Sequence, residues 1–502
     1  MTPPPEALVA QVSDPAAQLD AGLIAAPAEI FDETAVRAEI AASIPDGADG
    51  RAVRTATVAV LKNAISAGRT KIEDAFIHQP LAARPAVLSY AYLTDGVVRT
   101  VLYVAQTYLH PNPNPTEGER IAVVAVGGYG RGEMAPHSDV DLLFLNPWKI
   151  TPWAESLIES MLYMFWDLHL KVGHSSRTVK DCIRLGREDY TIRTAMLEHR
   201  FLAGDEGIAR VLSDKLKSDL FKNTASDFIE AKLAERAERH RKQGGQRYMV
   251  EPNVKEGKGG LRDLQTLFWI GKYIHSVRDA VDLVKVGLLR QDEYDDFVAA
   301  ESFLMAVRNH LHIVANRAMD QLTFDMQVEV ADRMGYVDRA GRRAVEVFMQ
   351  DYFRHATTVG ELTRIFLTAL EAKHVKQAPS LVNFFRRRRK VGDKYTIKQN
   401  RLTVTRQKPF LSDNLNLLRI FDEALRTGYL LHPDAMRLIS ANLHLIDDSM
   451  RASPEANSIF MDLLLKRGNP ERALRRMNEL GVLSAFVPEF APVVAMMQFN
   501  MY

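Results

Sequence analysis

Two aspartates beside a glycine-rich turn constrain the fold of this chain more than any other feature of its sequence. An apolar run over 121–126 leads into Gly-Gly-Tyr-Gly-Arg-Gly, and Asp139 and Asp141 lie at the start of a second apolar run that continues to Phe144. Runs rich in Val, Leu and Phe that are bounded by glycine and polar residues indicate buried strands. Because side chains alternate along a strand and residues rise about 3.3 Å each, the two aspartates share one face with Cα atoms about 7 Å apart.

Two acids that project together from an apolar strand require a positively charged partner. They repel each other and lose hydration on burial, so an apolar fold tolerates them only when their charge is neutralised. Two Mg²⁺ ions about 3.5–4 Å apart that bridge a triphosphate fit this spacing. The alternative is a solvated strand edge with two aspartates of no special role. The glycine turn and the flanking apolar runs favour the metal site.

The glycine turn is suited to phosphate. Glycine permits positive φ and close backbone approach, so Gly127 and Gly128 can bring N–H groups to phosphate oxygens. The chain contains no G-x-x-x-x-G-K-[ST] string, which argues against a P-loop. The turn reads G-G-x-G-x-G rather than the G-x-G-x-x-G of Rossmann dinucleotide-binding folds. In those folds the acid that contacts the ribose lies on the second strand, further along the chain than Asp139 and Asp141 lie here.

Gly-Gly followed by Asp-x-Asp on the next strand resembles the nucleotidyltransferase superfamily typified by DNA polymerase β. That resemblance implies a third carboxylate on a neighbouring strand, but the next strand-like run, 170–178, has no acid. Asp181 follows this run and is the first candidate, with a surface or capping role equally open. Arg177, within the run, is a candidate contact for the triphosphate, or else part of a structural salt bridge.

Composition limits the protein class without selecting a function. With 47% apolar and 25% charged residues the chain is typical of soluble proteins, and 502 residues predict two to four domains. A net charge of +1 is not the strong positive charge that is typical of nucleic-acid-binding proteins. The single cysteine, Cys182, suits a reducing cytoplasm. Without an apolar run of about 18 residues, or a basic residue before Arg37, we expect neither a membrane span nor a signal peptide.

We expect an α+β chain made of six segments. Residues at the start are rich in Pro and Ala, and a Pro-Asn-Pro-Asn-Pro linker at 111–115 precedes the two motif strands. Apolar residues at three-four spacing over 304–318 predict an amphipathic helix of a bundle, on which His310 and His312 are core or surface residues rather than ligands. The predicted segments are a loosely ordered tail (1–50), a helical segment (51–110), a polymerase-β-like core with a small mixed sheet (111–205), a helical bundle (206–375), a connector with the basic run 386–390 and a small hairpin (376–410), and a helical part (411–502).

A second glycine turn narrows the resemblance. The stretch 251–264, Glu-Pro-Asn-Val-Lys-Glu-Gly-Lys-Gly-Gly-Leu-Arg-Asp-Leu, leads into a helix, with Asp263 near the positive end of its dipole. Together with the first motif, it resembles the bacterial PII uridylyltransferase/uridylyl-removing enzymes. The resemblance extends from about residue 80 to residue 502. Its further stretches, in order, are 172–178, 308–312, 320–325, 476–483 and 487–490.

The resemblance implies transfer of UMP from UTP to a tyrosine hydroxyl of the signalling protein PII, with pyrophosphate leaving. Such transfer depends mostly on positioning and charge neutralisation. By the same resemblance Asp139 and Asp141 hold Mg²⁺, or Mn²⁺ in its place. Gly127 and Gly128 cradle phosphates, and Ser138 reaches an outer phosphate oxygen. The expected partners are UTP and PII, with no nucleic acid and no membrane.

Two alternatives stay open at this point. An adenylyltransferase acting on glutamine synthetase shares the Gly-Gly and Asp-x-Asp core and a Lys…Gly-Gly-x-Arg-Asp segment, but that family carries two nucleotidyltransferase halves and this chain shows one such motif. The second alternative is a catalytically silent regulatory module that binds nucleotide. The presence of both Asp139 and Asp141 argues against it.

The end of the chain carries a further expectation. The stretch 493–502 is apolar, and in the resembling family this point precedes the first histidine of a metal-binding HD phosphohydrolase domain, which two glutamine-sensing ACT domains follow. No His-Asp dipeptide occurs in the 502 residues. We therefore expect 411–502 to be the leading helices of an incomplete HD domain. The chain would attach UMP without removing it, and glutamine would act only where ACT domains are present.

Overall fold

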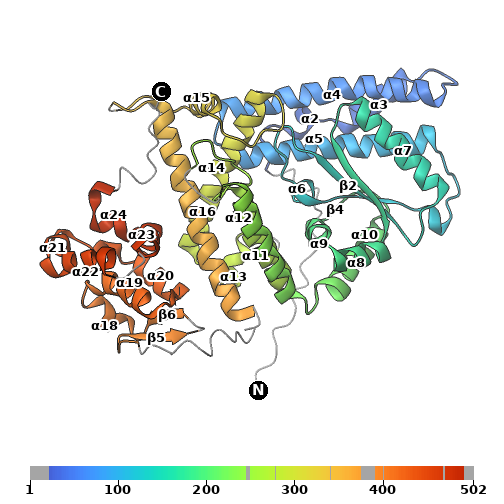
Figure 1. Ribbon diagram of the computed structural model, residues 1–502. Coiled ribbons are helices and arrows are strands. Elements are labelled where there is room, and N and C mark those ends of the chain that lie inside the picture. Colours follow the sequence, from blue (N-terminus) through green and yellow to red (C-terminus); the bar gives the residue numbers. More distant parts are fainter. Residues whose placement is uncertain are drawn as a thin grey trace. The chain divides into compact units, whose positions relative to one another are not determined.

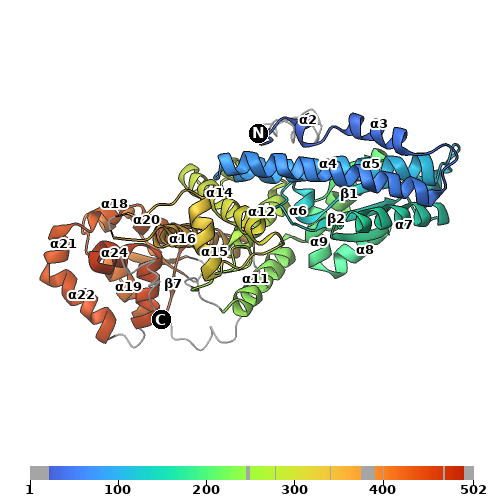
Figure 2. The same ribbon diagram turned by 90° about the horizontal axis from the view of Figure 1, so that it is seen from above.

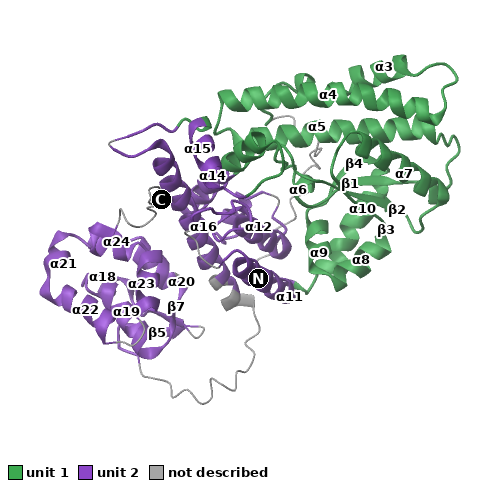
Figure 3. Ribbon diagram, turned by 45° about the horizontal axis from the view of Figure 1, so that its top comes forward, with its two compact units in different colours: residues 1–224, 305–320, 333–335 green, residues 225–304, 321–332, 336–502 purple. Residues whose placement is uncertain are grey.

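The computed structural model divides into two compact units, neither of which is contiguous in sequence (Figure 3). Unit 1 comprises residues 1–224, 305–320 and 333–335, and unit 2 comprises 225–304, 321–332 and 336–502. The predicted tail before residue 22, the basic run 386–390 and the apolar stretch 493–502 lie outside the residues that the structure describes. The described residues are 22–244, 249–277, 279–339, 341–374, 391–398, 401–466 and 470–490.

Unit 1 is built on a four-stranded mixed sheet in the order β3-β2-β1-β4. Strand β1 (Ala122–Ala125) pairs antiparallel with β2 (Val140–Asn146) and with β4 (Arg200–Gly204), while β2 pairs parallel with β3 (Val172–Thr178). The α+β class with a small mixed sheet is therefore confirmed. Strands β1 and β2 lie in the predicted apolar runs and β3 lies in the strand-like run 170–178, whereas 200–204 was not predicted as a strand.

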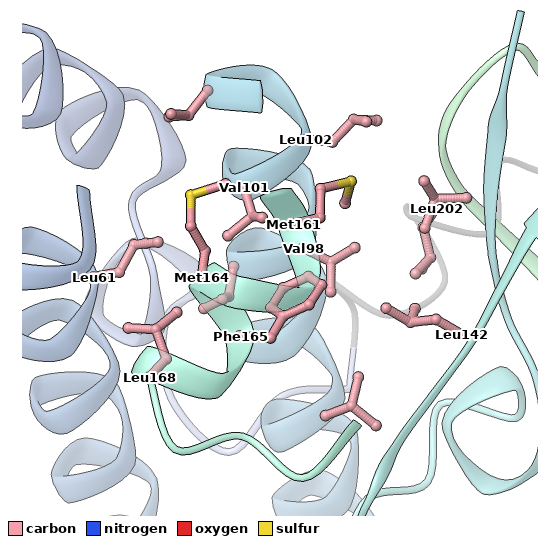
Figure 4. Packing of buried hydrophobic residues seen from close by; sticks show 14 of the residues in the cluster. Leu61, Val98, Val101, Leu102, Leu142, Met161, Met164, Phe165, Leu168 and Leu202 are labelled. Carbon is pink, nitrogen blue, oxygen red and sulfur yellow. The ribbon is translucent and has the colours of Figure 1, made fainter. Parts of the chain in front are cut away.

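One face of the sheet packs against long helices (Figures 1 and 2). Helix α4 (Gly50–His78) runs beside α5 (Ala83–Val104), and α7 (Pro152–Asp167) connects β2 to β3. Helix α7 begins where the Thr151 side chain accepts a hydrogen bond from the N–H of Ala154, with a proline in its first turn. The buried core between these helices and the sheet includes Leu61, Val98, Leu102, Leu142, Met161, Phe165 and Leu202 (Figure 4).

The other face is covered by α8 (Val179–Glu188), α9 (Tyr190–Leu197), α10 (Glu206–Lys215) and η3 (Leu216–Phe221). Ile208 and Leu212 of α10 bury with Leu143 and Leu145 of β2 in one apolar cluster. The predicted boundary at residue 205 is therefore too early, because α10 and η3 complete the core of the sheet. Residues 305–320 also belong to unit 1, where His310 is buried and its Nε2 lies 3.0 Å from the Pro80 carbonyl oxygen.

The prediction that residues 1–50 form a loosely ordered tail is wrong for residues 27–43. Residues 27–43 form two helices, α2 (Pro27–Ile30) and α3 (Glu33–Ser43), whose Ile30, Val36 and Ile40 are buried in the core with α4 and α5. Asp32 caps α3 by accepting a hydrogen bond from the N–H of Ala35 at 3.0 Å. The apolar residues of these two helices are few and lie in a stretch rich in Ala and Pro. The sequence therefore did not indicate that they are buried.

Unit 2 begins as a helical bundle, as expected. Helices α11 (Ala225–Lys242) and α12 (Leu261–His275) pack together, with the rings of Phe228 and Tyr273 stacked at 3.9 Å. The bundle continues with α13 (Asp282–Lys285), most of α14 (Gln291–Ala315), α15 (Phe324–Arg333) and α16 (Ala344–His374). Among the described helices, none is both long and apolar enough to span a membrane.

The last part of unit 2 has its own core. The predicted hairpin is present as β5 (Tyr395–Lys398) and β6 (Arg401–Val404), and β6 also pairs with β7 (Leu430–Leu431). Leu402 of the hairpin is buried with the helices that follow it, so the predicted division at residue 410 is wrong: hairpin and helices share one core. These helices are α18 (Gln407–Leu411), α19 (Asn416–Thr427), α20 (Pro433–Ser440), α21 (Asp448–Ala452), α22 (Pro454–Leu465), α23 (Pro470–Glu479) and α24 (Val482–Phe486).

Candidate active site

The two motif aspartates lie at one edge of the sheet. Strand β1 ends at this edge, and β2, β3 and β4 begin there, as their pairing requires. Asp139 directly precedes β2 and is exposed, whereas Asp141 is the second residue of the strand and is partly buried. The structure thus brings Asp139, Asp141 and the glycine turn to the same edge, as predicted from sequence.

Two glycines leave space for the Asp141 carboxylate. Gly127 has a φ of +62°, and a Cβ atom on it would lie 3.3 Å from Asp141 Oδ2. Gly173 pairs with Asp141 across the parallel strands, and a Cβ there would lie 2.5 Å from Asp141 Oδ1. Gly127 was predicted as a phosphate contact, while the function of Gly173 was missed because it depends on strand register.

The glycine turn forms the short helix α6 (Gly127–Gly130). Its glycines differ in how much space is available for a side chain. A Cβ on Gly130 would lie 1.8 Å from the carbonyl oxygen of Glu198, so only glycine fits there. At Gly128 the nearest atom would be the Glu133 carbonyl oxygen at 3.4 Å, an ordinary contact. Gly127 and Gly128 open the helix, and N–H groups of a first helical turn have no partner within the helix.

Buried arginines hold this turn against β4. Arg131 Nη1 lies 2.6 Å from Glu198 Oε2, and Arg131 Nε lies 2.9 Å from Glu133 Oε2. Burial disfavours the charge of Arg131, but the two carboxylates outweigh it and raise the pKa of the guanidinium. Arg200 donates to Asp95 at 2.6 Å. The Arg131–Glu198 pair was missed from sequence, although the arginine inside the glycine motif was its available signal.

Glu198 is the acid nearest to β4 at this edge, but its carboxylate is already neutralised by Arg131. Asp139 is less committed. Its Oδ1 lies 3.0 Å from Lys171 Nζ, in a pair whose side chains are 47% and 80% exposed, respectively. Such exposed pairs contribute about 0–1 kcal/mol, so a bound cation can displace the lysine.

Asp181 is not brought to the pair. Thr178 pairs with Asn146 at the opposite end of the strands, about 16 Å from the level of Asp141. Asp181 follows Thr178 and closes a capping box at the start of α8, in which Thr178 Oγ1 donates to Asp181 Oδ2 at 2.7 Å. This hydrogen bond lowers the pKa of Asp181. Asp181 therefore lies outside the candidate metal site.

Two further predicted residues have definite positions. Arg177 pairs with Leu145 and lies four residues beyond Gly173, about 13 Å along the strand from the level of Asp141. Ser138 lies in a tight turn: its N–H donates to the Ala135 carbonyl oxygen at 3.0 Å, and its Oγ accepts from the Ala135 N–H at 3.0 Å. The turn holds Ser138 directly before Asp139.

The donor set suits Mg²⁺. Carboxylate oxygens are hard ligands, and Mg²⁺ is commonly held by one or two of them together with substrate phosphates and water. Among the described residues, no group of three or more His, Cys, Asp or Glu side chains could hold a metal ion. Asp139 and Asp141 are the candidate ligands of unit 1, and Gly127 and Gly173 lie on either side of the Asp141 carboxylate.

The second motif forms a different kind of carboxylate site. Asp263 of α12 is fully buried, and its Oδ1 lies 3.1 Å from Arg236 Nε, 2.5 Å from Arg239 Nη2 and 3.0 Å from His240 Nε2. Its Oδ2 accepts from the Gly259 N–H at 3.0 Å. Burial alone would raise the pKa of Asp263, but the hydrogen bond from His240 and the arginine charges hold it far below its usual range.

Three family models match successive parts of the chain. Residues 114–184 match the model of the nucleotidyltransferase domain, residues 227–367 that of the GlnD PII-uridylyltransferase, and residues 395–486 that of the third domain of uridylyltransferase GlnD. The chain is 67% identical over 473 residues (94% of its length, 52% of the relative) to the bifunctional uridylyltransferase/uridylyl-removing enzyme of Ruegeria pomeroyi. It is 61% identical over 504 residues (100% and 54%) to that of Cereibacter sphaeroides.

The chain spans about half the length of the curated relatives it matches. Within that span the three matched domains follow one another in order along the sequence. The chain is therefore similar in sequence to the PII-uridylyltransferases over three successive domains.

Proposed function

We propose that this chain transfers UMP from UTP to a tyrosine hydroxyl of the signalling protein PII and releases pyrophosphate. The observation that carries the proposal is the pair Asp139 and Asp141 at the sheet edge beside the glycine turn. The relatives' name, bifunctional uridylyltransferase/uridylyl-removing enzyme, supports the same donor chemistry. The single cysteine and the absence of a membrane-spanning helix among the described residues are compatible with a cytoplasmic reaction.

The chain's own residues serve mainly to position the reactants. Asp139 and Asp141 would hold Mg²⁺, or Mn²⁺ in its place, which when bound neutralises charge on the triphosphate. Lys171 would leave Asp139 as the metal binds. Gly127 and Gly128 would allow backbone N–H groups to approach phosphate oxygens, with Ser138 close by. Because the attacking hydroxyl belongs to PII, this chain supplies no nucleophile.

Choice of the base is separate from this arrangement. Backbone contacts to phosphate do not distinguish uracil from adenine, so Gly127 and Gly128 serve UTP and ATP equally. Preference for UTP must therefore come from contacts to the base made by other residues.

Transfer assays with UTP and ATP, each labelled on the α-phosphate, and purified PII test the proposal. We expect label from UTP on PII and little from ATP. Label on glutamine synthetase from ATP instead would favour the adenylyltransferase alternative. Nucleotide binding without transfer to either protein would indicate a silent regulatory module.

We also propose that these 502 residues do not by themselves remove UMP. The proposal rests on the lack of a His-Asp dipeptide in the sequence. Incubation of uridylylated PII with the chain, Mn²⁺ and glutamine tests it, and release of UMP would contradict it.

A further inference from the structure

A cavity in unit 1 lies close to the metal-binding edge but belongs to a different face of the sheet. Its volume is about 290 Å³, and it is lined by residues of α4, α5, the turn before β2, the first residue of β2, the stretch before β3 and the stretch after α14. We propose that this cavity binds a phosphate-type oxyanion at a site separate from the carboxylate pair. The lining includes Arg69, Tyr90, Thr94, Val140, Lys171 and Arg317.

The charges on the lining have one sign. Arg69, Lys171 and Arg317 reach the cavity from three separate parts of the chain, and the lining contains no Asp or Glu. Within the described residues, Lys171 has its one salt bridge with Asp139, outside the cavity, while Arg69 and Arg317 make none. Three cations around one hollow repel one another, so an anion between them lowers the electrostatic energy.

Glu73 of α4 is the acid whose charge interacts with Arg69. Its carboxylate accepts a hydrogen bond from the Tyr90 hydroxyl at 3.3 Å. Burial raises the pKa of Glu73, while the charge of Arg69 acts to lower it. No salt bridge joins Arg69 to an acid within the described residues, so its guanidinium keeps hydrogen-bond donors for an external anion.

The arginine side chains suit an oxyanion. Apolar side chains line much of the cavity, and the Tyr90 and Thr94 hydroxyls donate to Glu73 and to the Tyr90 carbonyl oxygen, respectively. Charge-assisted hydrogen bonds are stronger than neutral ones, and the planar fork of arginine matches the oxygens of phosphate. A compact oxyanion with more than one charge fits this lining better than a neutral ligand.

Strand geometry separates the cavity from Asp141. Val140 lines the cavity, and adjacent residues of a strand point to opposite faces. Val140 is buried in the core with α4, α5 and α7, whereas Leu143 and Leu145, on the Asp141 face, pack with α8 and α10. Lys171 is the link between the two places, since it lines the cavity and pairs with Asp139.

Titration calorimetry with inorganic phosphate, in EDTA and at low ionic strength, tests the site without metal, nucleotide or PII. We expect Arg69→Gln and Arg317→Gln each to weaken phosphate binding about tenfold or more. The matched control is Arg51→Gln, which removes the same charge from an exposed position of α4 and should change the affinity less than twofold. Arg69→Lys, which keeps the charge, should restore part of the affinity.

The result that would overturn the proposal is undetectable phosphate binding, or binding that Arg69→Gln and Arg317→Gln weaken no more than Arg51→Gln. Circular dichroism checks that the variants are folded. Asp141→Asn should leave phosphate affinity within about twofold, and a tenfold loss there would contradict the separation of the sites. Failure of UMP transfer would not affect these measurements, which involve no transfer.

Competition by UTP in EDTA distinguishes two sources of the oxyanion. Displacement of phosphate by UTP, lost in Arg69→Gln, would identify the occupant as a phosphate group of the nucleotide. Phosphate binding that UTP does not displace would identify it as a free phosphate ion. Either result supports a phosphate-type site in the cavity.

Discussion

The two motifs of this chain each place a carboxylate beside a glycine turn, but the two sites differ in how their charge is neutralised. Asp139 at the sheet edge is 47% exposed and has one exposed lysine at 3.0 Å. Asp263 in the bundle is fully buried and is held by two arginines, a histidine and a backbone N–H. Asp139 therefore has one weakly held partner, which the proposed metal ion would displace, whereas both oxygens of Asp263 already have hydrogen-bond partners.

The difference shows how to separate a ligand-binding carboxylate from a structural one. Both follow similar sequence patterns of glycines and charges, so pattern alone does not distinguish them. A carboxylate that binds a ligand keeps solvent access and weak partners, while a buried carboxylate must be fully paired because an unpaired charge inside the protein is very unfavourable. The predictions below test this distinction.

The largest effect is expected at the pair proposed to bind metal. Asp139→Asn and Asp141→Asn each remove a negative charge without changing the shape of the side chain. We expect UMP transfer to PII to fall by at least about a thousandfold, which corresponds to about 4 kcal/mol of transition-state stabilisation, with the free energy of unfolding nearly unchanged. Transfer rates and urea unfolding curves measure the two effects.

The matched control is Asp214→Asn, at an exposed position of α10, which removes the same charge from unit 1. It should keep the parental transfer rate. Rates within a few-fold of the parent for both motif variants would remove the metal assignment.

At Asp263 the effect should be on stability. Asp263→Asn leaves Arg236, Arg239 and His240 around a neutral side chain, and breaking a buried ion pair typically costs about 3–5 kcal/mol. We expect the free energy of unfolding of unit 2 to fall by about this amount, measured by urea denaturation. Glu230→Gln, exposed on α11, is the control and should change it by less than about 0.5 kcal/mol.

Gly173→Ala tests whether the position of the Asp141 carboxylate matters as well as its charge, because the substitution leaves that charge in place. A Cβ atom 2.5 Å from Asp141 Oδ1 must displace the carboxylate. We expect UMP transfer to fall about 10- to 100-fold while unfolding changes little, because a displacement of about 1 Å can cost about 100-fold in rate. Gly50→Ala, whose Cβ meets Leu109 at 3.6 Å, should leave the rate unchanged. Equal rates for the two variants would show that Asp141 needs no such space.

Acid should weaken the Asp263 cluster only at low pH. Because the pKa of Asp263 is lowered on folding, its ionisation contributes stability above the unfolded value of about 3.9. That contribution is lost as pH falls through the lower folded value. We expect the stability difference between the parent and Asp263→Asn to stay constant from pH 7 to 5 and to shrink below pH 4. A difference that already shrinks between pH 7 and 5 would contradict the lowered pKa.

The smallest effect is expected for the exposed partner of Asp139. Lys171→Gln removes a pair whose lysine is 80% exposed, so the free energy of unfolding should change by less than about 0.5 kcal/mol. Urea unfolding of unit 1 measures this. A loss above 1 kcal/mol would mean that the pair stabilises the fold and is not a weak partner that a metal displaces.

Much of the local structure could be predicted from sequence. The apolar runs predicted β1 and β2, and a strand-like run predicted β3. The polar Gln-Asn pair at 399–400 predicted the hairpin, and the aspartates lie where strand alternation puts them. These features depend on neighbouring residues only. Strand β4, with the sequence Arg-Phe-Leu-Ala-Gly, was missed because its short apolar run follows a helical pattern without a turn signal.

Features that depend on pairing between distant segments could not be predicted. That Gly173 stands opposite Asp141 follows from the parallel register of β2 and β3, which sequence spacing does not fix. The same register places Asp181 at the far end of the sheet, which excludes it from the pair. The buried Arg131–Glu198 and Asp263 clusters likewise join residues far apart in sequence.

The way in which the chain passes between its units has a consequence for synthesis. Unit 1 takes residues 305–320 from the middle of the sequence of unit 2. On the ribosome, the four strands are complete once residue 204 has emerged, but two parts of unit 1 must wait for about 110 further residues. These parts are the contact of His310 with the Phe76 ring, at 4.6 Å, and the Arg317 wall of the cavity. A nascent chain or fragment that stops near residue 224 would expose that surface to chaperones, so unit 1 is not obtained by cutting there.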